Sequence, residues 1–205
     1  MSEVATLCIE KGLMPRDAQA SAAQLLGRAF FTDPLFAHVQ PSERMRRRGL
    51  PRLFETLLRD AAQRGGVFST IEGVVAWTPV RSLRASLLEQ IRRGYVHVPL
   101  QLGLVATYRL QAHDDWCNRR TVAHSSLDAA YIHCVGVDPT LAGQGIGSRL
   151  VNLALSRIGQ TYGLCTLRTE QPRNVRFYEK LGFRCVEQLS VPTTGISAWF
   201  FVREV

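Results

Sequence analysis

Several features that would place a chain in a specialised class are missing here. No stretch of the 205 residues approaches about 18 consecutive apolar residues, so we expect no membrane-spanning helix. Residues 1–20 carry several charges and lack a continuous apolar core, which argues against a signal peptide. The five cysteines are scattered and include no CxxC pair, so neither a disulfide framework nor a zinc site is predicted. These absences favour a cytoplasmic protein with reduced thiols.

Histidines show no metal-binding spacing either. The sequence contains no HxxxH and no HxH motif, and no metal is predicted. His113 stands beside Asp114 and Asp115 in the segment HDDWCNRR, which reads as a polar helix end and loop. We therefore predict that His113 is a polar surface residue.

The overall composition is that of an ordinary globular domain, with 46% hydrophobic and 20% charged residues. A formal charge of +8 and an isoelectric point near 9.8 suggest an anionic partner. The arginine-rich run of residues 44–52 has no interleaved aromatic residues that could stack on bases, so it is interpreted as a solvated helix face. We expect neither a nucleic-acid nor a membrane partner. The protein is expected to be a monomer or a homodimer.

Apolar spacing divides the chain into alternating elements. A short strand at 4–9 is followed by a helix that begins at Asp17 as N-cap. A second helix follows Ser42, and Pro51 within it predicts a kink or a new first turn. Residues 67–70 and 73–80 predict a hairpin, and helices are expected over 82–95 and 99–117. A strand at 131–137 is followed by a helix that ends near Gly159. The pattern then continues with a strand at 164–169, a helix opened by Pro172, and strands at 184–191 and 196–203.

The most informative stretch is YIHCVGVDPTLAGQGIGSRL, residues 131–150. An apolar strand leads into a turn with Gly143, Gly145 and Gly147, and a helix follows. The first amides of a helix have no internal partners and lie at the positive end of the helix dipole, so this arrangement predicts binding of a phosphorylated ligand.

Two common phosphate-binding motifs do not fit this turn. A Walker A loop requires a lysine after its last glycine, and Ser148 stands there instead. In a dinucleotide fingerprint the third glycine would fall at Ser148 or Leu150. The nucleotide-hydrolase and dehydrogenase interpretations therefore each lack a required residue.

The spacing V-x-P-x-x-x-G-x-G-x-G-x-x-L resembles the acetyl-CoA pyrophosphate loop of the GCN5-related N-acetyltransferase (GNAT) superfamily. Residues 169–183, TEQPRNVRFYEKLGF, resemble the second CoA-contacting segment of that superfamily. GVVAWTP in the first half and the closing SAWFFVR look like the puromycin N-acetyltransferase branch and its bacterial relatives.

This resemblance implies an α/β (α+β) fold. We expect a mixed, mostly antiparallel sheet of about six or seven strands, splayed at the CoA site and flanked by helices. Residues 1–205 would form a single domain in which the helical insertion at 82–122 covers the substrate side. The implied activity is acetyl transfer from acetyl-CoA to a primary amine of a small molecule, by direct attack in a ternary complex. A peptide or protein amine, or acyl-CoA binding without turnover, remains as an alternative.

Site residues follow from the resemblance and from their chemistry. Tyr178 is predicted to donate a proton to the leaving thiolate, and His133, Glu170 or His97 to act as general base. Asp33 lies where relatives place acceptor-binding residues, and Trp77 and Tyr95 could form an apolar wall. The predicted CoA-binding residues are Val135, Gly136, Val137, Gly143, Gln144, Gly145, Ile146, Gly147, Ser148, Asn174 and Tyr178.

Two positions depart from the family pattern. Ala142 stands where the superfamily usually has arginine or glutamine, so one side-chain interaction with the pyrophosphate is absent. Arg168 stands where relatives of the puromycin branch often carry an acid, so a possible base or acceptor contact is replaced by a cation.

Overall fold

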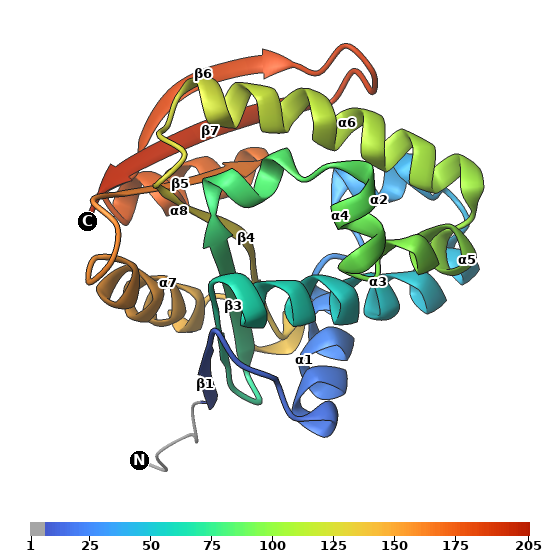
Figure 1. Ribbon diagram of the computed structural model, residues 1–205, viewed down its shortest axis with the longest axis horizontal. Coiled ribbons are helices and arrows are strands. Elements are labelled where there is room, and N and C mark those ends of the chain that lie inside the picture. Colours follow the sequence, from blue (N-terminus) through green and yellow to red (C-terminus); the bar gives the residue numbers. More distant parts are fainter. Residues whose placement is uncertain (1–6) are drawn as a thin grey trace.

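A computed structural model describes residues 7–205 and shows one seven-stranded sheet flanked by helices (Figure 1). The strand order is β1-β2-β3-β4-β5-β7-β6, and only the pair β4 and β5 is parallel. The strands are β1 (Leu7–Glu10), β2 (Gly66–Ser69), β3 (Gly73–Pro79), β4 (Ala130–Val137), β5 (Leu164–Thr169), β6 (Arg184–Ser190) and β7 (Ser197–Glu204). The mixed, mostly antiparallel sheet that was predicted is confirmed.

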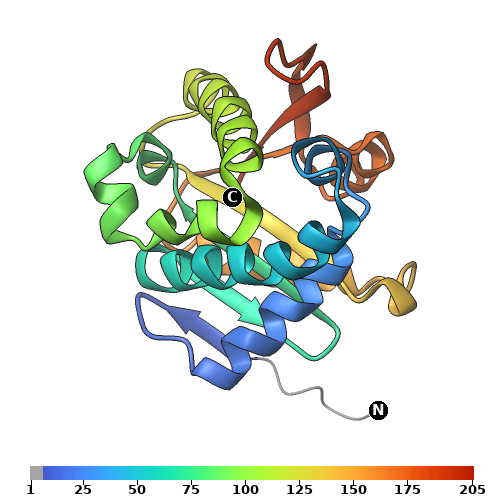
Figure 2. The same ribbon diagram turned by 90° about the vertical axis from the view of Figure 1, so that its right-hand side faces the viewer.

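Two apolar layers cover the sheet, because alternate residues of each strand point to opposite faces. Val74 and Ala76 of β3 pack under α1 (Arg16–Ala29), α2 (Pro34–Val39) and α3 (Glu43–Arg64). Val75 and Trp77 pack on the other face, under α7 (Ile146–Ile158) and α8 (Val175–Lys180). Figures 1 and 2 show the central strands between these two groups of helices.

The first helices differ in detail from the sequence prediction. Pro15, not Asp17, precedes α1, and Asp17 lies in its first turn. The short helix α2 was not predicted; Asp33 begins it by accepting a hydrogen bond from the amide of Leu35 at 3.0 Å. Helix α3 follows Ser42, as predicted, with Ser42 as its N-cap, and continues through Pro51. Of the strand predicted at 4–9, residues 7–9 lie in β1, and the others lie outside the described residues.

One arginine of the run 44–52 is not solvated. Arg46 is buried, and its guanidinium donates to the carbonyls of Phe31 at 2.9 Å and Gln40 at 2.7 Å. Arg46 thus joins α3 to the segments on either side of α2. The prediction of a solvated face holds for the exposed Arg44, Arg47, Arg48 and Arg52.

The inserted segment between β3 and β4 is divided into more pieces than predicted. It comprises the 3-10 turns η1 (Val80–Arg84) and η2 (Tyr95–His97) and the helices α4 (Leu87–Arg92), α5 (Val98–Leu102) and α6 (Leu104–Ala123). Gly94 and Gly103 interrupt it with φ angles of 90° and 92°, a left-handed conformation that glycine adopts without strain. Helix α6 runs straight through the segment 113–120, which had been predicted as a helix end and loop.

The second half of the chain follows the prediction closely. The strands β4 and β5, the helix α7 and the final hairpin of β6 and β7 lie where they were expected. The turns η3 (Pro139–Leu141) and η4 (Pro172–Asn174) precede α7 and α8. Among residues 7–205, no helix combines the length and the hydrophobicity that crossing a membrane requires.

Candidate active site

The two parallel strands separate halfway along their length. The strands β4 and β5 pair only from Ala130 to Ile132 on β4 and from Cys165 to Leu167 on β5. Beyond these pairs β4 continues beside β3 alone, and β5 beside β7 alone. The sheet is therefore splayed after Ile132, as predicted.

The register shows which main-chain groups of β4 are left open. The amide of Asp138 donates to the carbonyl of Glu72 at 2.9 Å, which makes these two residues a hydrogen-bonded antiparallel pair. Such pairs alternate along a ladder, so Gly136 is bonded to β3, whereas the amides and carbonyls of Val135 and Val137 point toward the splayed side. Val135 and Val137 thus offer a short free strand edge.

Gly136 has a packing role instead. A Cβ at this position would lie 2.5 Å from Cδ2 of Leu26 and 3.4 Å from Cβ of Ala29, both on α1. Its main-chain groups face β3, so the predicted CoA contact of Gly136 does not fit this register. The glycine allows α1 to lie directly on the central strand.

The turn after β4 carries a run of free amides. Within the described residues, the amides of Gly143 to Ser148 have no hydrogen-bond acceptor; the first amide of this helix that bonds is Arg149, to the carbonyl of Gly145 at 3.1 Å. Gln144 is exposed, and the buried side chain of Ile146 fixes the first turn of α7 in the core. These amides sit at the positive end of a 13-residue helix and form a site for an anion.

Backbone conformation explains the glycines of this turn. Gly143 and Gly145 have φ angles of 85° and 76°, and a Cβ on either would meet no atom within 4 Å. The space that a Cβ would occupy at these two positions is therefore open. Asp138 caps the preceding turn; the Arg28 guanidinium and the Thr140 hydroxyl and amide lower the pKa of Asp138 to about 2.

Helix α8 brings Tyr178 to the splayed strands. The ring is 7% exposed and packs among Phe177, Phe183 and Phe201. Within residues 7–205 its hydroxyl has no hydrogen-bond partner, yet the oxygen keeps some accessible surface. Burial raises the pKa of Tyr178, as do the neighbouring groups Cys134, Tyr131, Glu170 and Asp33, so the proton stays on the hydroxyl.

Asn174 lies at the start of the same helix. Its side-chain amide donates to Oγ1 of Thr169 at 3.2 Å, which ties α8 to the last residue of β5. Asn174 therefore lies beside the splayed strands, as its predicted role in binding the pantetheine arm requires.

Glu170 follows β5 and sits in a cluster of polar side chains. Its Oε1 accepts from Nε of Arg168 at 2.9 Å and lies 3.2 Å from Nε2 of His113. Burial alone would raise the pKa of Glu170, but the Arg168 charge and the His113 hydrogen bond outweigh it and lower that pKa. Glu170 is thus ionised at neutral pH.

Arg168, which departs from the family pattern, also fastens the inserted segment. Its guanidinium contacts Asp114 and donates to Oδ1 of Asn118 at 3.2 Å, both on α6. These contacts were not predicted, because residues 113–120 were expected to be a helix end and loop. The polar residues at 114 and 118, one helical turn apart, were the available signal.

The prediction for His113 is wrong. The side chain is fully buried rather than on the surface, because α6 continues past it and packs against β5 and β7. His113, Cys117 and Glu170 also bring possible metal-binding atoms within 4.8 Å of one another. These donors already have partners: His113 contacts both Glu170 and Thr194, and Oε1 of Glu170 accepts from Nε of Arg168. We therefore retain the prediction of no metal.

Asp33, the residue before α2, is affected by the charge of Glu170. Burial, followed by the negative charge of Glu170, raises the pKa of Asp33 to about 7, although the amides of Leu35 and Phe36 and the charge of Arg173 lower it. Asp33, Glu170 and Tyr178 act on one another electrostatically, so the structure brings these three predicted site residues together.

His133 is less suited to be a general base. Its Nε2 lies 2.8 Å from Oγ1 of Thr78, and its ring packs edge-on against Tyr131. Burial and the positive charges of Arg168 and Arg93 lower the pKa of His133 to about 3. A group with such a low pKa has little tendency to take a proton from an amine.

The predicted apolar wall of Trp77 and Tyr95 is not found, because the two residues pack in layers on opposite faces of the sheet. Trp77 is 2% exposed and packs on Phe68 in the layer under α7, so it cannot line a substrate site. Tyr95 is half-buried beside Asp60 and Arg93, and burial and the Asp60 charge raise its pKa. The charge of Asp114, which contacts Arg168, also raises the pKa of Tyr95. His97 is exposed on η2.

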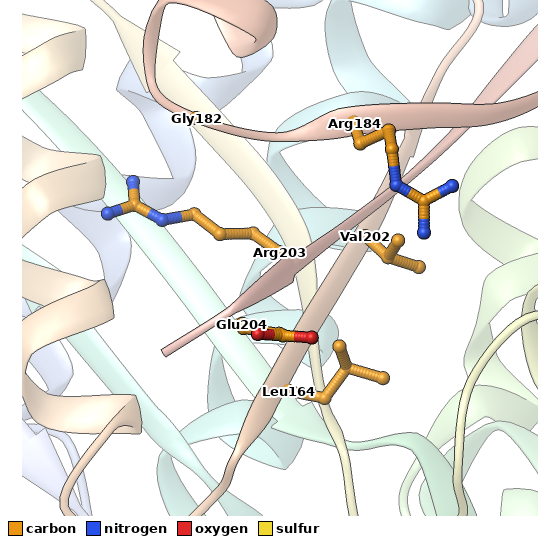
Figure 3. A pocket seen from close by; sticks show the side chains of 6 residues that line it. All are labelled: Leu164, Gly182, Arg184, Val202, Arg203 and Glu204. Atoms are coloured by element: carbon orange, nitrogen blue, oxygen red, sulfur yellow. The ribbon is translucent and has the colours of Figure 1, made fainter.

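A surface hollow of about 470 Å³ lies elsewhere (Figure 3). It is lined by Leu164, Gly182, Arg184, Val202, Arg203 and Glu204. Leu164 begins β5, whereas Glu170 follows its end, so the hollow lies at the opposite end of that strand from the splayed region. None of the predicted site residues lines it.

Comparisons with known proteins agree with this geometry. Residues 101–185 match the model of the acetyltransferase (GNAT) domain. Among solved structures, the chain is similar to a histone acetyltransferase HPA2 and related acetyltransferase from Corynebacterium glutamicum, with 18% identity over 98% of this chain and 96% of that one and a TM-score of 0.64.

Two further structures bear names of amine acetyltransferases. Agmatine N-acetyltransferase matches with 16% identity over 98% of this chain and 99% of that one, at a TM-score of 0.59. The polyamine N-acetyltransferase of Drosophila melanogaster matches with 17% identity over 98% and 100%, at a TM-score of 0.58. At these identities the structures show the fold, and the domain match adds the family signature. The chain has the fold of the GNAT acetyltransferases, and the match of residues 101–185 to the GNAT domain model supports an acyltransferase enzyme.

Proposed function

We propose that the protein transfers the acetyl group of acetyl-CoA to a primary amine of a small molecule, by direct attack within a ternary complex. One observation carries the proposal: the free amides of residues 143–148 lie next to the open edge of Val135 and Val137 where β4 leaves β5. An anion site joined to a free strand edge suits a ligand with a diphosphate and an amide-containing tail.

The residues present fit acetyl-CoA. The amides from Gly143 to Ser148 would hold the diphosphate, and the open space beside Gly143 and Gly145 admits it without a Cβ in the way. Gln144 could supply the side-chain hydrogen bond that Ala142 is unable to make. Val135, Val137 and Asn174 would pair with the pantetheine amides. When bound, acetyl-CoA supplies a thioester that an amine can attack.

Tyr178 would then interact with the departing CoA thiolate. Its hydroxyl is protonated and has no partner within the described residues, and its ring belongs to the same apolar cluster as Val135 and Val137. Because its pKa is raised, Tyr178 is a weaker acid than a free tyrosine, and we expect it to stabilise the departing thiolate chiefly as a hydrogen-bond donor. A free amide of β4 would stabilise the oxyanion, a contribution of about 3 kcal/mol for a well-aimed donor.

The acceptor amine would bind between Asp33 and Glu170. Glu170 is ionised and held by Arg168, so it suits recognition of an ammonium group. Asp33 has a pKa of about 7, so it is better suited than His133 to take the amine proton. This assignment revises the predicted base.

The names of similar structures support a small amine as acceptor. Two solved structures with the same fold are called agmatine and polyamine N-acetyltransferases. The sequence resemblance to the puromycin N-acetyltransferase branch points to the same general class. We further propose that the inserted segment covers the substrate side, since α6 supplies contacts to Arg168 and Glu170, and that the protein works in the cytoplasm as a monomer or homodimer.

The test is release of CoA thiol from acetyl-CoA in the presence of an amine panel. The panel should contain aliphatic diamines, aminonucleosides, amino acids and short peptides with a free N-terminus. Turnover with small amines supports the proposal. Turnover with peptides alone would replace the acceptor class, and binding of acetyl-CoA without turnover of any amine would indicate a binding protein.

A further inference from the structure

The inserted helix α6 places a buried histidine directly against the acceptor-side carboxylate. His113 is 0% exposed, and both of its ring nitrogens have partners: Nε2 lies 3.2 Å from Oε1 of Glu170, and Nδ1 lies 3.0 Å from Oγ1 of Thr194. The three residues come from α6, from the end of β5 and from the loop between β6 and β7. A neutral imidazole can bridge two groups only as donor to one and acceptor from the other.

Charge decides which nitrogen carries the proton. Glu170 is ionised and can only accept, so Nε2–H donates to it. Nδ1 then accepts from the Thr194 hydroxyl, whose oxygen in turn accepts from the amide of Ile196 at 3.4 Å. Burial raises the pKa of the Cys117 thiol, 3.5 Å from Nε2, to about 12, so no thiolate competes with Glu170 for this proton.

The contacts on Glu170 are one-sided. Arg168 and His113 both bond Oε1, and within the described residues Oε2 has no hydrogen-bond partner. Two donors on one oxygen fix the plane of the carboxylate and leave the other oxygen for a ligand. Glu170 also acts electrostatically on Asp33 and Tyr178, so its position sets the geometry of the acceptor end.

We propose that His113 is a positioning residue, which holds Glu170 through the Nε2–Oε1 hydrogen bond so that the second carboxylate oxygen can receive the acceptor amine. The inserted helix would thereby set acceptor binding without touching the acceptor. This inference rests on the proposed acetyl transfer.

Two substitutions separate the hydrogen bond from packing. His113→Gln can place an amide N–H near the position of Nε2, whereas His113→Leu fills similar volume without a donor. We expect His113→Leu to raise the KM for the amine about tenfold, as the removal of a hydrogen bond to a charged group implies, with the KM for acetyl-CoA changed less than about twofold. Removal of the donor also raises the pKa of Glu170, so the acidic limb of kcat/KM should move to higher pH.

The glutamine variant should recover most of the amine KM and the original pH profile. Gln111→Ala, on the exposed side of the same helix, is the matched control and should change neither quantity. If His113→Leu leaves both the amine KM and the pH profile unchanged, the positioning role is refuted. Equal effects on KM in the leucine and glutamine variants with an unchanged pH profile would instead show a packing role and equally refute it.

A readout without catalysis keeps this inference separate from the proposed function. Carbon-13 NMR titration of the Glu170 carboxyl should show a higher pKa in His113→Leu than in the native protein. If the native protein turns over no amine, the proposed function fails, while the titration still tests the hydrogen bond. Stoichiometric zinc in the purified protein, bound through His113 and Cys117, would overturn the assignment, because Nε2 could not then donate to Glu170.

Discussion

At the scale of single residues, Tyr178 has the most direct predicted role. We expect Tyr178→Phe to lower kcat about tenfold or more, because the thiolate leaves without a hydrogen-bond donor. Binding of acetyl-CoA should change little, since its main contacts are main-chain amides of other segments. Stopped-flow or steady-state release of CoA thiol measures the first quantity, and calorimetry measures the second. An unchanged kcat would remove Tyr178 from the chemistry.

Asp33 allows a test in which stability and activity move in opposite directions. Its pKa is about 7 in the folded protein against an ordinary value of 3.8, so the folded state holds this proton more tightly than the unfolded chain. The ionised carboxylate therefore destabilises the fold increasingly as pH rises above the ordinary value, and the effect is complete above about pH 7.

Asp33→Asn removes this charge and keeps a good helix cap for α2. We expect a higher Tm, with a larger gain at about pH 8 than at about pH 5, together with a lower kcat, because the group proposed to take the amine proton is lost. Differential scanning calorimetry at the two pH values and steady-state kinetics provide the measurements. A Tm gain that is the same at both pH values would show that Asp33 does not titrate as described.

At the scale of elements, the glycines of the site divide into two kinds. Gly145 has a φ of 76° and open space beside it, whereas Gly136 has its space filled by α1. We expect Gly145→Ala to weaken acetyl-CoA binding about tenfold, because the new Cβ projects beside the free amides and the left-handed backbone is strained by about 1 kcal/mol.

Gly136→Ala should lower stability and leave acetyl-CoA binding nearly unchanged. Its Cβ would collide with Leu26, so we expect a lower Tm with acetyl-CoA affinity changed little. Gly147→Ala is a control on the same loop, since its Cβ would meet only ordinary contacts with Phe177 and Val137 at 3.4 and 3.6 Å. If Gly145→Ala and Gly136→Ala weakened acetyl-CoA binding equally, the two glycines would not have the separate roles described.

The sequence predicted elements where one signal dominates locally. Strand β5 and helix α7 were found because apolar periodicity, Gly159 and the glycine turn agree with one another. The insertion was predicted less well, because Gly94 and Gly103 divide an otherwise continuous apolar pattern, and because α6 is polar on one side and still buried there. Periodicity cannot reveal that His113 is buried, since its partners Glu170 and Thr194 lie 57 and 81 residues away.

In the candidate site too, features set by local sequence were predicted and features set by distant contacts were not. The loop amides could be predicted because they depend on local order along the chain, and Tyr178 because its helix follows directly on β5. Trp77 was predicted to line the substrate site, but alternation along β3 places it with Val75 in the layer under α7. Arg168 looked like the replacement of an acid, and only the fold shows that it joins Glu170 to the inserted helix.

At the scale of the whole molecule, charge and ligand binding can be tested together. The chain carries a formal charge of +8, and acetyl-CoA is an anion whose approach such a field favours. Ligand that binds only the folded state raises stability by about 2.7 kcal/mol at a concentration of 100 times Kd, so the rise in Tm reports affinity.

We expect the rise in Tm with acetyl-CoA to be larger at about 20 mM than at about 300 mM potassium chloride, because added salt screens the attraction between protein and ligand. The Tm of the free protein at each salt concentration is the reference, since salt also relieves repulsion within the protein. Direct titration calorimetry should give a Kd that increases with salt. A Kd independent of salt would mean that the bonds of the loop amides, which form at short range and are poorly screened, determine the affinity without help from the net charge.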